Sequence, residues 1–162
     1  MTSGGCQCGA IRYCVPDELH DPHLCHCRMC QKAAGNYFMA LGGVKREAFT
    51  ITRGEIAWFR SSDAVRRGFC RDCGTPLVFD PIGEDEIAIT LGSLDDPAAI
   101  EPGVHYGSEA MMPWFARLHT LPEETTEASG DAGGEPHTTI RATNRQHPDH
   151  ATGDWPPPHS PR

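Results

Sequence analysis

The amino-acid sequence predicts an all-β domain built from short antiparallel strands. Short apolar-rich stretches recur between turn signals rich in Gly, Pro and Asp, a spacing typical of all-β proteins. Ile11, Tyr13 and Val15 alternate with Arg12 and Cys14, as expected for a strand with one buried face. The sequence contains no internal repeat and no long amphipathic helix that would indicate another class.

The expected elements fill the first three quarters of the chain. Gly35 is expected to end a short helical turn, and a hairpin is expected across Arg53 and Gly54. Trp114 and Phe115, near the end of the ordered part, are expected to anchor in the core. The elements, in order, are expected over residues 11–15, 31–34, 36–44, 49–52, 55–59, 65–69, 77–79, 86–91 and 104–115.

The composition changes after Pro122. Residues 123–162 contain almost no aliphatic side chains and are rich in Thr, Gly, Pro, Asp and His. Such a segment cannot bury enough apolar area to offset the entropy lost on ordering. Its four histidines are dispersed among prolines without a repeated spacing, which argues against a metal site. We therefore expect a domain over residues 1–122 and a disordered acidic tail whose deletion leaves thermal stability unchanged.

The formal net charge of −8 is shared evenly along the chain. Residues 1–122 carry 11 Lys and Arg against 15 Asp and Glu, and residues 123–162 carry 3 against 7, so each part contributes −4. Neither part is basic enough to attract a phosphate backbone, which argues against nucleic acid as a partner. No leader peptide or membrane-spanning apolar run is visible, so the expected location is the cytoplasm, with no membrane association.

Four of the eight cysteines form two close pairs that suit a closed zinc site. Cys6 and Cys8 are two residues apart and need two more ligands. Cys70 and Cys73 form a Cys-x-x-Cys knuckle followed by glycine, which frees the turn to direct backbone amides at the sulfurs. Together the two pairs are expected to hold a structural zinc that joins the start of the chain to its middle. A small domain gains stability from such a link.

The stretch CHCRMC supplies a second set, Cys25, Cys27 and Cys30. In an extended segment residues i and i+2 point to the same face, and the Cys-x-x-Cys step brings Cys30 to the same point. Three thiolates suit a tetrahedral zinc and leave its fourth position open, which is typical of a catalytic site. We therefore expect two zinc ions per chain, with this second site as the functional one.

Other interpretations of the cysteines are weaker. A disulfide framework is disfavoured because a reducing cytosol and metal-like spacing favour zinc, and because adjacent Cys-x-Cys bridges would be strained. Cys14 has no ligand partner nearby and is expected to be an ordinary strand residue. A closed module with two full sites would need His26 as an eighth ligand, yet His26 points away from its neighbours and is expected behind the site. His105 and His119 are expected to be ordinary histidines.

Several ordered motifs resemble one family. These are GGCQCGAIRY, CHCRMCQKAAG, FCRDCGTPL, GSLDD and HYGSEAMMPWF, spread from Gly4 to Phe115, and they are similar to the glutathione-dependent formaldehyde-activating enzymes, a family that includes centromere protein V. The resemblance implies a Mss4-like, or β-tent, fold. It also implies a structural zinc at the four-cysteine set and a catalytic zinc at the three-cysteine set. The tail has no counterpart in the family pattern.

The resemblance implies carbon–sulfur chemistry, namely formation or cleavage of S-(hydroxymethyl)glutathione from glutathione and formaldehyde. A small-molecule thiol and an aldehyde are therefore the expected partners, with a non-catalytic zinc module that binds a thiol ligand or a protein as the alternative. Zinc favours the thiolate form of a bound thiol. Two zinc ions and seven thiolates would leave a charge of −3, so cations are expected nearby. The candidates to balance the thiolates or to meet substrate carboxylates are Arg28, Lys32, Arg66, Arg67 and Arg71.

Overall fold

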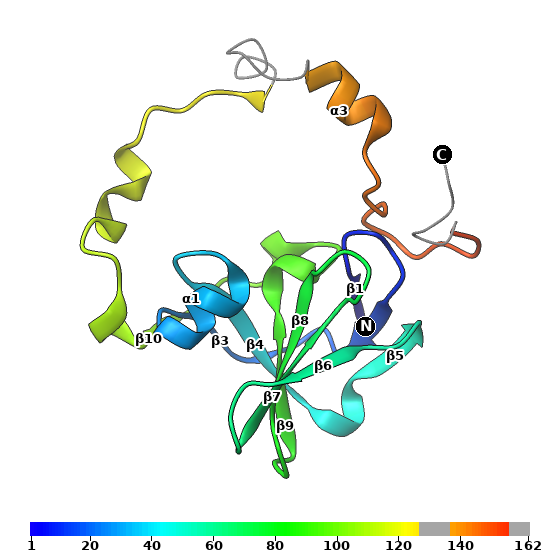
Figure 1. Cartoon of the computed structure of the whole chain (residues 1–162), viewed down its shortest axis with the longest axis horizontal. Coiled ribbons are helices and arrows are strands. Elements are labelled where there is room, and N and C mark those ends of the chain that lie inside the picture. The colour runs from blue at the N-terminus through cyan, green and yellow to red at the C-terminus, as the bar shows by residue number, and fades with distance from the viewer. Residues whose placement is uncertain (127–136, 156–162) are drawn as a thin grey trace.

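Two β-sheets form the body of the protein in a computed structural model that describes residues 1–126 and 137–155 (Figure 1). The larger sheet has seven strands in the order β10-β3-β4-β9-β8-β7-β6, all antiparallel except the parallel pair β10 and β3. The smaller sheet is antiparallel, in the order β1-β2-β5. The predicted all-β fold is thus confirmed. The strands are β1 (Thr2–Gly5), β2 (Arg12–Val15), β3 (His20–Cys25), β4 (Met39–Lys45), β5 (Thr50–Arg53), β6 (Ala57–Arg60), β7 (Val65–Phe69), β8 (Pro76–Pro81), β9 (Glu86–Thr90) and β10 (Val104–Tyr106).

Helices are short in the described part of the chain. One seven-residue α-helix, α1, follows the CHCRMC stretch, and Gly35 ends it in the left-handed conformation, as the sequence predicts. The helical elements of the described residues are α1 (Arg28–Ala34), η1 (Arg46–Ala48), η2 (Leu91–Ser93), η3 (Pro97–Ala99), η4 (Ser108–Ala110), η5 (Phe115–Thr120) and α3 (His137–Thr143). None of the helices in the described residues has the length and apolar character needed to cross a membrane.

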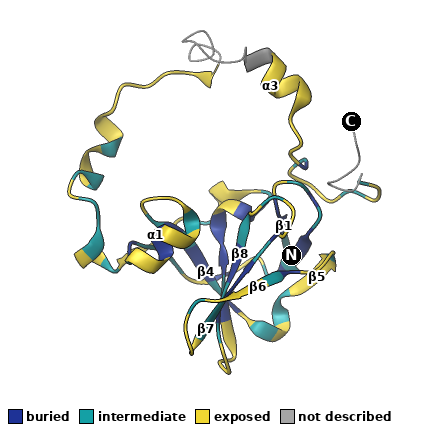
Figure 2. Cartoon of the chain, viewed as in Figure 1, coloured by how far each residue is buried: buried dark blue, intermediate teal, exposed yellow. Residues whose placement is uncertain are grey.

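The main hydrophobic core joins the two sheets (Figure 2). Tyr13 and Val15 of β2 are buried, together with Ile11 just before the strand, so the predicted alternation is confirmed. Leu77 of β8 and Ile89 of β9 meet them from the large sheet and are fully buried. Burying such side chains contributes about 1.5–3 kcal/mol each before the entropy cost of ordering.

The predicted hairpin across Arg53 and Gly54 is wrong. β5 pairs with β2 in the small sheet, whereas β6 pairs with β7 at the edge of the large one. Gly54 has a positive φ of 72°, and its Cα lies so close to the Ala10 carbonyl that no side chain would fit. The turn therefore carries the chain from one sheet to the other, which a local alternation pattern cannot reveal.

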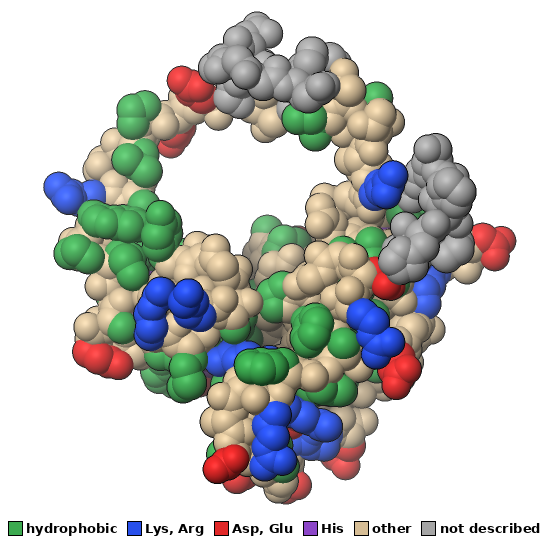
Figure 3. Space-filling view, viewed as in Figure 1, with side chains coloured by type: hydrophobic (Ala, Val, Ile, Leu, Met, Phe, Trp, Pro, Cys, Tyr) green, Lys and Arg blue, Asp and Glu red, His purple; other side chains and the backbone are tan. Residues whose placement is uncertain are grey.

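Trp114 and Phe115 do not anchor in the main core. Both are half-buried and pack at the side of the large sheet, where Trp114 contacts Tyr37 with ring centroids 4.6 Å apart. Phe115 contacts His26 edge-to-face at 4.8 Å. Hydrophobic side chains gather along this stretch after β10 on the face drawn in Figure 3. The two aromatic residues thus cover the region behind the CHCRMC stretch.

Residues 146–155, here called the docked segment, differ from the disordered tail that the composition predicts. The chain leaves the body after β10 and returns through α3 to the side of β1 (Figure 1). There the backbone N–H of His147 donates to the carbonyl of Gln7 at 2.7 Å, and Trp155 Nε1 donates to the carbonyl of Cys8 at 2.6 Å. The expectation of disorder over residues 127–136 and 156–162 lies outside the described part, and the domain boundary at residue 122 stays a prediction.

Candidate functional site

Two tight turns bring the first four cysteines together. The loop between β1 and β2 supplies Cys6 and Cys8, and the turn between β7 and β8 supplies Cys70 and Cys73. All four sulfurs lie within 4.8 Å of one another. The Sγ atoms of Cys6 and Cys8 are 3.6 Å apart, and those of Cys8 and Cys70 are 3.8 Å apart. The structure thus brings together the set expected from the spacing.

The thiol pKa values show that these sulfurs cannot all ionise unaided. Burial raises the pKa of Cys6, Cys8 and Cys70, each to about 11. Burial also opposes ionisation of Cys73, but the hydroxyl of Thr75, 3.1 Å from its sulfur, and nearby backbone amides lower its pKa to about 7. A bound dication would deprotonate the remaining thiols and compensate their mutual repulsion.

The second set lies where β3 meets α1. Cys25 is the last residue of β3, and Cys27 caps the N-terminus of α1, where its sulfur accepts the backbone N–H of Cys30 at 3.4 Å. The three sulfurs lie within 4.8 Å of one another. Burial raises the pKa of Cys25 to about 12. Burial acts in the same direction on Cys27, but the Cys30 amide and the neighbouring thiols outweigh it and lower the pKa.

Both donor sets fit zinc. Four sulfurs around a tetrahedral zinc at about 2.3 Å lie about 3.8 Å from one another, close to the sulfur separations of the first set. Backbone amides also donate to the sulfurs, as Ile11 does to Cys6 at 3.2 Å. The first set supplies four sulfurs and the second three. Among the described residues, no other His, Cys, Asp or Glu joins the three sulfurs of the second set.

Strand β10 and the residues after it, up to Ala110, lie behind the second set. His26 is fully buried, and its Nε2 lies 2.9 Å from Nδ1 of His105 in β10, so it turns away from the sulfurs as expected. The buried side-chain amide of Gln31 donates to the carbonyls of His26 and Ala110, at 2.8 and 3.0 Å. Gly107, with φ of 64°, lets this segment approach the backbone of Cys27 closely. Sequence reasoning missed the roles of His105 and Gln31, because only the parallel pairing of β10 with β3 brings these segments together.

A cavity of about 310 Å³ opens at the second set. Cys25, Cys27 and Cys30 line it together with mostly apolar side chains from β4, β8 and β9. Its volume lies at the lower end of the range for small-molecule sites. The other lining residues are His20, Asp21, His23, Met29, Leu41, Gly43, Arg67, Phe79, Pro81, Glu86, Ile87 and Ala88.

The structure separates the five candidate cations. Arg67 lines the cavity, and its Nη2 lies 3.5 Å from Sγ of Cys30. Arg66, the preceding residue of β7, points to the other face, and its Nε donates to Oδ2 of Asp80 at 2.6 Å. Arg28, Lys32 and Arg71 are exposed and do not line the cavity.

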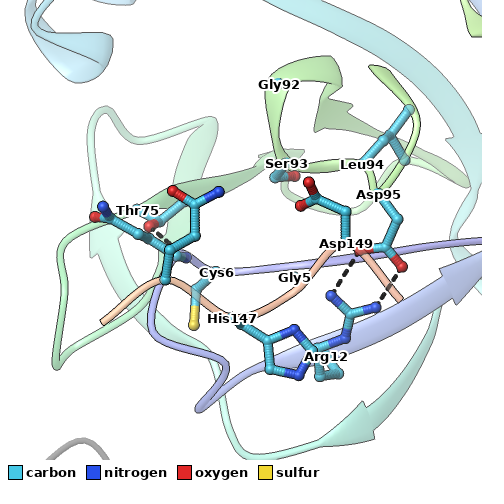
Figure 4. Close-up of a pocket in the computed structure, with 12 residues that line it drawn as sticks. Gly5, Cys6, Arg12, Thr75, Gly92, Ser93, Leu94, Asp95, His147 and Asp149 are labelled. Atoms are coloured by element: carbon cyan, nitrogen blue, oxygen red, sulfur yellow. Dashed lines mark hydrogen bonds and ion pairs between the residues drawn. The ribbon is translucent and has the colours of Figure 1, made fainter. Parts of the chain in front are cut away.

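A second, polar cavity of about 250 Å³ lies beside Cys6 (Figure 4). Arg12 and Asp95 form a buried two-fold ion pair on one side of it, with Nη1 2.8 Å from Oδ1. His147 and Asp149 of the docked segment also line this cavity. Sequence reasoning missed both the ion pair and this contact. His119 is exposed in η5, as expected of an ordinary histidine, and Cys14 stands apart from both sets.

A family model described as glutathione-dependent formaldehyde-activating enzyme matches residues 1–108. An uncharacterized lyase of Schizosaccharomyces pombe is 31% identical over 78 residues, which cover 47% of this chain and 55% of that protein. A Phaeosphaeria nodorum protein named for the same formaldehyde-activating enzyme is 28% identical over 74 residues, which cover 44% of this chain and 39% of that protein. The chain thus spans about half or less of the length of these curated relatives.

A solved structure supports the fold. The crystal structure of a Rhodobacter sphaeroides protein superposes with a TM-score of 0.52 at 20% identity, covering 64% of this chain and 98% of that one. At this identity the likeness concerns the fold alone. It shows that the arrangement of sheets described above also occurs in an experimentally determined protein.

Proposed function

Because the chain belongs to the glutathione-dependent formaldehyde-activating enzyme family, we propose that it is a zinc-dependent carbon–sulfur lyase that acts on a thiol adduct. The reaction would be of the S-(hydroxymethyl)glutathione synthase type, with glutathione and formaldehyde as partners. One observation carries the proposal: three cysteine sulfurs, without a fourth ligand among the described residues, open onto a cavity of about 310 Å³. An incomplete ligand set beside a cavity is the arrangement of a catalytic zinc site.

The proposed metal content is two zinc ions per chain. The set formed by Cys6, Cys8, Cys70 and Cys73 would hold a structural ion, and the set formed by Cys25, Cys27 and Cys30 a catalytic one. Bound at the second set, zinc would supply a position at which an external thiol is held as its thiolate. In the forward reaction the thiol sulfur forms a bond to the aldehyde carbon. The carbon–oxygen π electrons move to oxygen, which takes up the equivalent of the proton that the thiol lost.

The chain's own residues would orient the thiol and exclude water. The amide of Cys30 fixes the sulfur of Cys27 at the start of α1, and Gln31 holds the backbone behind it. Apolar side chains such as Leu41 and Phe79 form much of the cavity wall. A dry wall strengthens every electrostatic interaction within the cavity, because it removes competing water. A cytoplasmic location, where glutathione would be at hand, remains part of the proposal.

Exchange spectroscopy on the zinc-loaded protein tests the function. Glutathione and ¹³C-formaldehyde form their adduct spontaneously, so the rate of exchange between free aldehyde and adduct is measured by NMR with and without protein. The wild type is expected to increase this rate, whereas Cys27→Ser, which removes one of the three sulfurs, is expected to lose the effect. Cys14→Ser serves as the matched control, because Cys14 belongs to neither set.

The same experiment separates the alternative function. If the zinc-loaded wild type leaves the exchange rate at its spontaneous value, the lyase proposal is wrong. Binding of glutathione without acceleration would then support the non-catalytic zinc module. A protein that folds without metal would contradict both.

A further inference from the structure

Arg67 is a buried cation with an unusual set of partners. Arg67 is only 8% exposed. Its Nη1 lies 3.7 Å from Sδ of Met39, and its Nη2 lies 3.5 Å from Sγ of Cys30. The guanidinium also lies 5.1 Å from the centroid of the Phe79 ring. A guanidinium carries five N–H donors, and two weak contacts to sulfur do not replace the water that it loses on burial.

Other buried or half-buried arginines of this chain, unlike Arg67, form ion pairs with carboxylates. Arg12 pairs with Asp95, and both Arg46 and Arg66 pair with the buried Asp80. No carboxylate in the described part of the chain forms an ion pair with Arg67. A buried charge is normally paired, because an unpaired one costs several kcal/mol. The missing partner is therefore expected to be an anion from outside the chain, or the metal-bound thiolates.

Arg67 lies between two cavities. The first is the cavity of about 310 Å³ at the three-cysteine set, and the second, of about 400 Å³, lies on the side of β6 and α1 and is lined by Phe59, Val78 and Ala33 among others. Arg67 is the only Arg or Lys that lines either cavity in the described part of the chain. Asp21 and Glu86 also line the first cavity, but Glu86 is already paired with Lys45 at 2.8 Å.

Arg67 can serve both the metal-bound thiolates and an anionic ligand group, because its side chain lines the cavity. Zinc with three thiolates carries −1, which one guanidinium would neutralise. The planar guanidinium can still present N–H donors to a carboxylate in the cavity, and such charge-assisted hydrogen bonds are the stronger class. Since Nη2 lies 3.5 Å from Sγ of Cys30, a carboxylate bound to the guanidinium and a sulfur held at the open position could belong to one ligand.

We propose that Arg67 binds a carboxylate of the thiol ligand and so selects thiols that carry a carboxylate. This inference rests on the proposed function, because it assumes that an external thiol binds at the three-cysteine set. Arg67 would anchor the ligand at one end while the metal holds the sulfur at the other. Thiols without an anionic group would lose the anchor and bind more weakly.

The test compares two thiols of nearly the same shape on the same protein. 3-Mercaptopropionate and its neutral amide are titrated into protein carrying cobalt in place of zinc, and the sulfur-to-cobalt charge-transfer band reports binding. The wild type is expected to bind the acid at least about tenfold more tightly than the amide. In Arg67→Gln this ratio is expected to fall to about one, with the affinity for the amide nearly unchanged.

Two further variants keep the test decisive. Arg67→Lys retains a charge but not the planar fork, and it is expected to give an intermediate ratio even if Arg67→Gln fails to fold. Lys32→Gln removes an exposed charge from α1 and is expected to keep the wild-type ratio. Each ratio is measured within one protein sample, so partial loss of folded protein does not change it.

The possible results separate this inference from the function on which it rests. If the wild type binds both thiols equally, Arg67 does not bind the carboxylate, although the proposed function stands. If Arg67→Gln weakens both thiols alike and lowers the cobalt content, Arg67 only balances the thiolate charge, and the inference is wrong. If neither thiol changes the spectrum of the wild type, the proposed function and the inference both fail.

Discussion

Replacing Trp155 with alanine should release the docked segment from the body of the protein. The indole Nε1 donates to the carbonyl of Cys8 at 2.6 Å, and the ring meets that of His147 with centroids 4.7 Å apart. Gly9 lies directly after Cys8 and permits this contact, because a Cβ at this position would lie 2.7 Å from Nε1 of Trp155. Trp155 thus contributes both a hydrogen bond and an aromatic contact to the docking.

The expected loss follows from these two contacts. A hydrogen bond of this kind contributes about 0.5–1.5 kcal/mol, and an edge-on aromatic pair contributes about 0.5–1.5 kcal/mol. Trp155→Ala should therefore weaken docking by about 1–3 kcal/mol, which corresponds to about a 5- to 150-fold increase in the population of the undocked state. The remaining contacts, including the bonds from Arg53 to Thr152, should hold the segment only in part.

Hydrogen exchange at one amide reports the change. The backbone N–H of His147 donates to the carbonyl of Gln7, so it is protected only while the segment is docked. Its exchange rate should increase by the same 5- to 150-fold factor in Trp155→Ala. Ile140→Ala is the matched control, because Ile140 lies in α3 of the same tail and is exposed. If the His147 amide of the wild type exchanges at the rate of an open chain, the segment is not docked and the tail is disordered as its composition predicts.

The remaining predictions concern the metal sites and the Arg12–Asp95 ion pair. Cys73→Ser should abolish cooperative folding, because structural zinc binding is coupled to folding. Cys27→Ser should reduce bound zinc from two ions to one and keep the fold. Metal analysis with circular dichroism measures both effects, and the reverse pattern would contradict the assignment of the two sites. The zinc affinity of the wild type should fall as the pH is lowered, since protons compete for the thiolates. A competition titration measures this affinity, and no change between pH 8 and 6 would contradict the zinc assignment. Asp95→Asn should lower the free energy of unfolding by about 3–5 kcal/mol, because it leaves the Arg12 guanidinium buried and unpaired, and urea unfolding measures this loss. Burial raises the pKa of Asp95, but the Arg12 guanidinium outweighs burial and holds this pKa below its usual value. The wild type should therefore lose this stabilisation as the pH falls below about 4. If the free energy of unfolding of Asp95→Asn lies as far below that of the wild type at pH 3 as at pH 7, the argument is wrong.

Cysteine spacing predicts the composition of both clusters, because sequence distance limits which sulfurs can meet. Cys25, Cys27 and Cys30 lie on one short segment, and the two remaining pairs each lie in a tight turn. Local signals of this kind survive in any fold that keeps the turns. Alternation predicts β2 for the same reason, since Ile11, Tyr13 and Val15 show their burial directly in their spacing.

Features that depend on distant partners are not visible in the sequence. The pattern around Gly54 is that of a hairpin, yet β5 and β6 belong to different sheets, because β5 pairs with the distant strand β2 and β6 pairs with β7, the next strand along the chain. Nothing in the sequence distinguishes Arg66 from Arg67, and only the placement of β7 assigns one to Asp80 and the other to Cys30. The docking of residues 146–155 is not visible in the sequence either. Trp155 is a single aromatic residue in a polar stretch, and one such residue is too weak a signal of docking.

Strand β7 links the two cysteine sets. Successive residues of a strand point to opposite faces of the sheet, so Arg66 and Arg67 must point apart. Cys70 follows directly after β7, so the four-sulfur set lies at the end of this strand. Because a shift of one residue would turn Arg67 away from Cys30 and bring Arg66 in its place, the register of β7 decides which cation reaches the second set. A metal at the first set would therefore do more than stabilise the fold, since it would hold the strand in the register that gives the open site its cation.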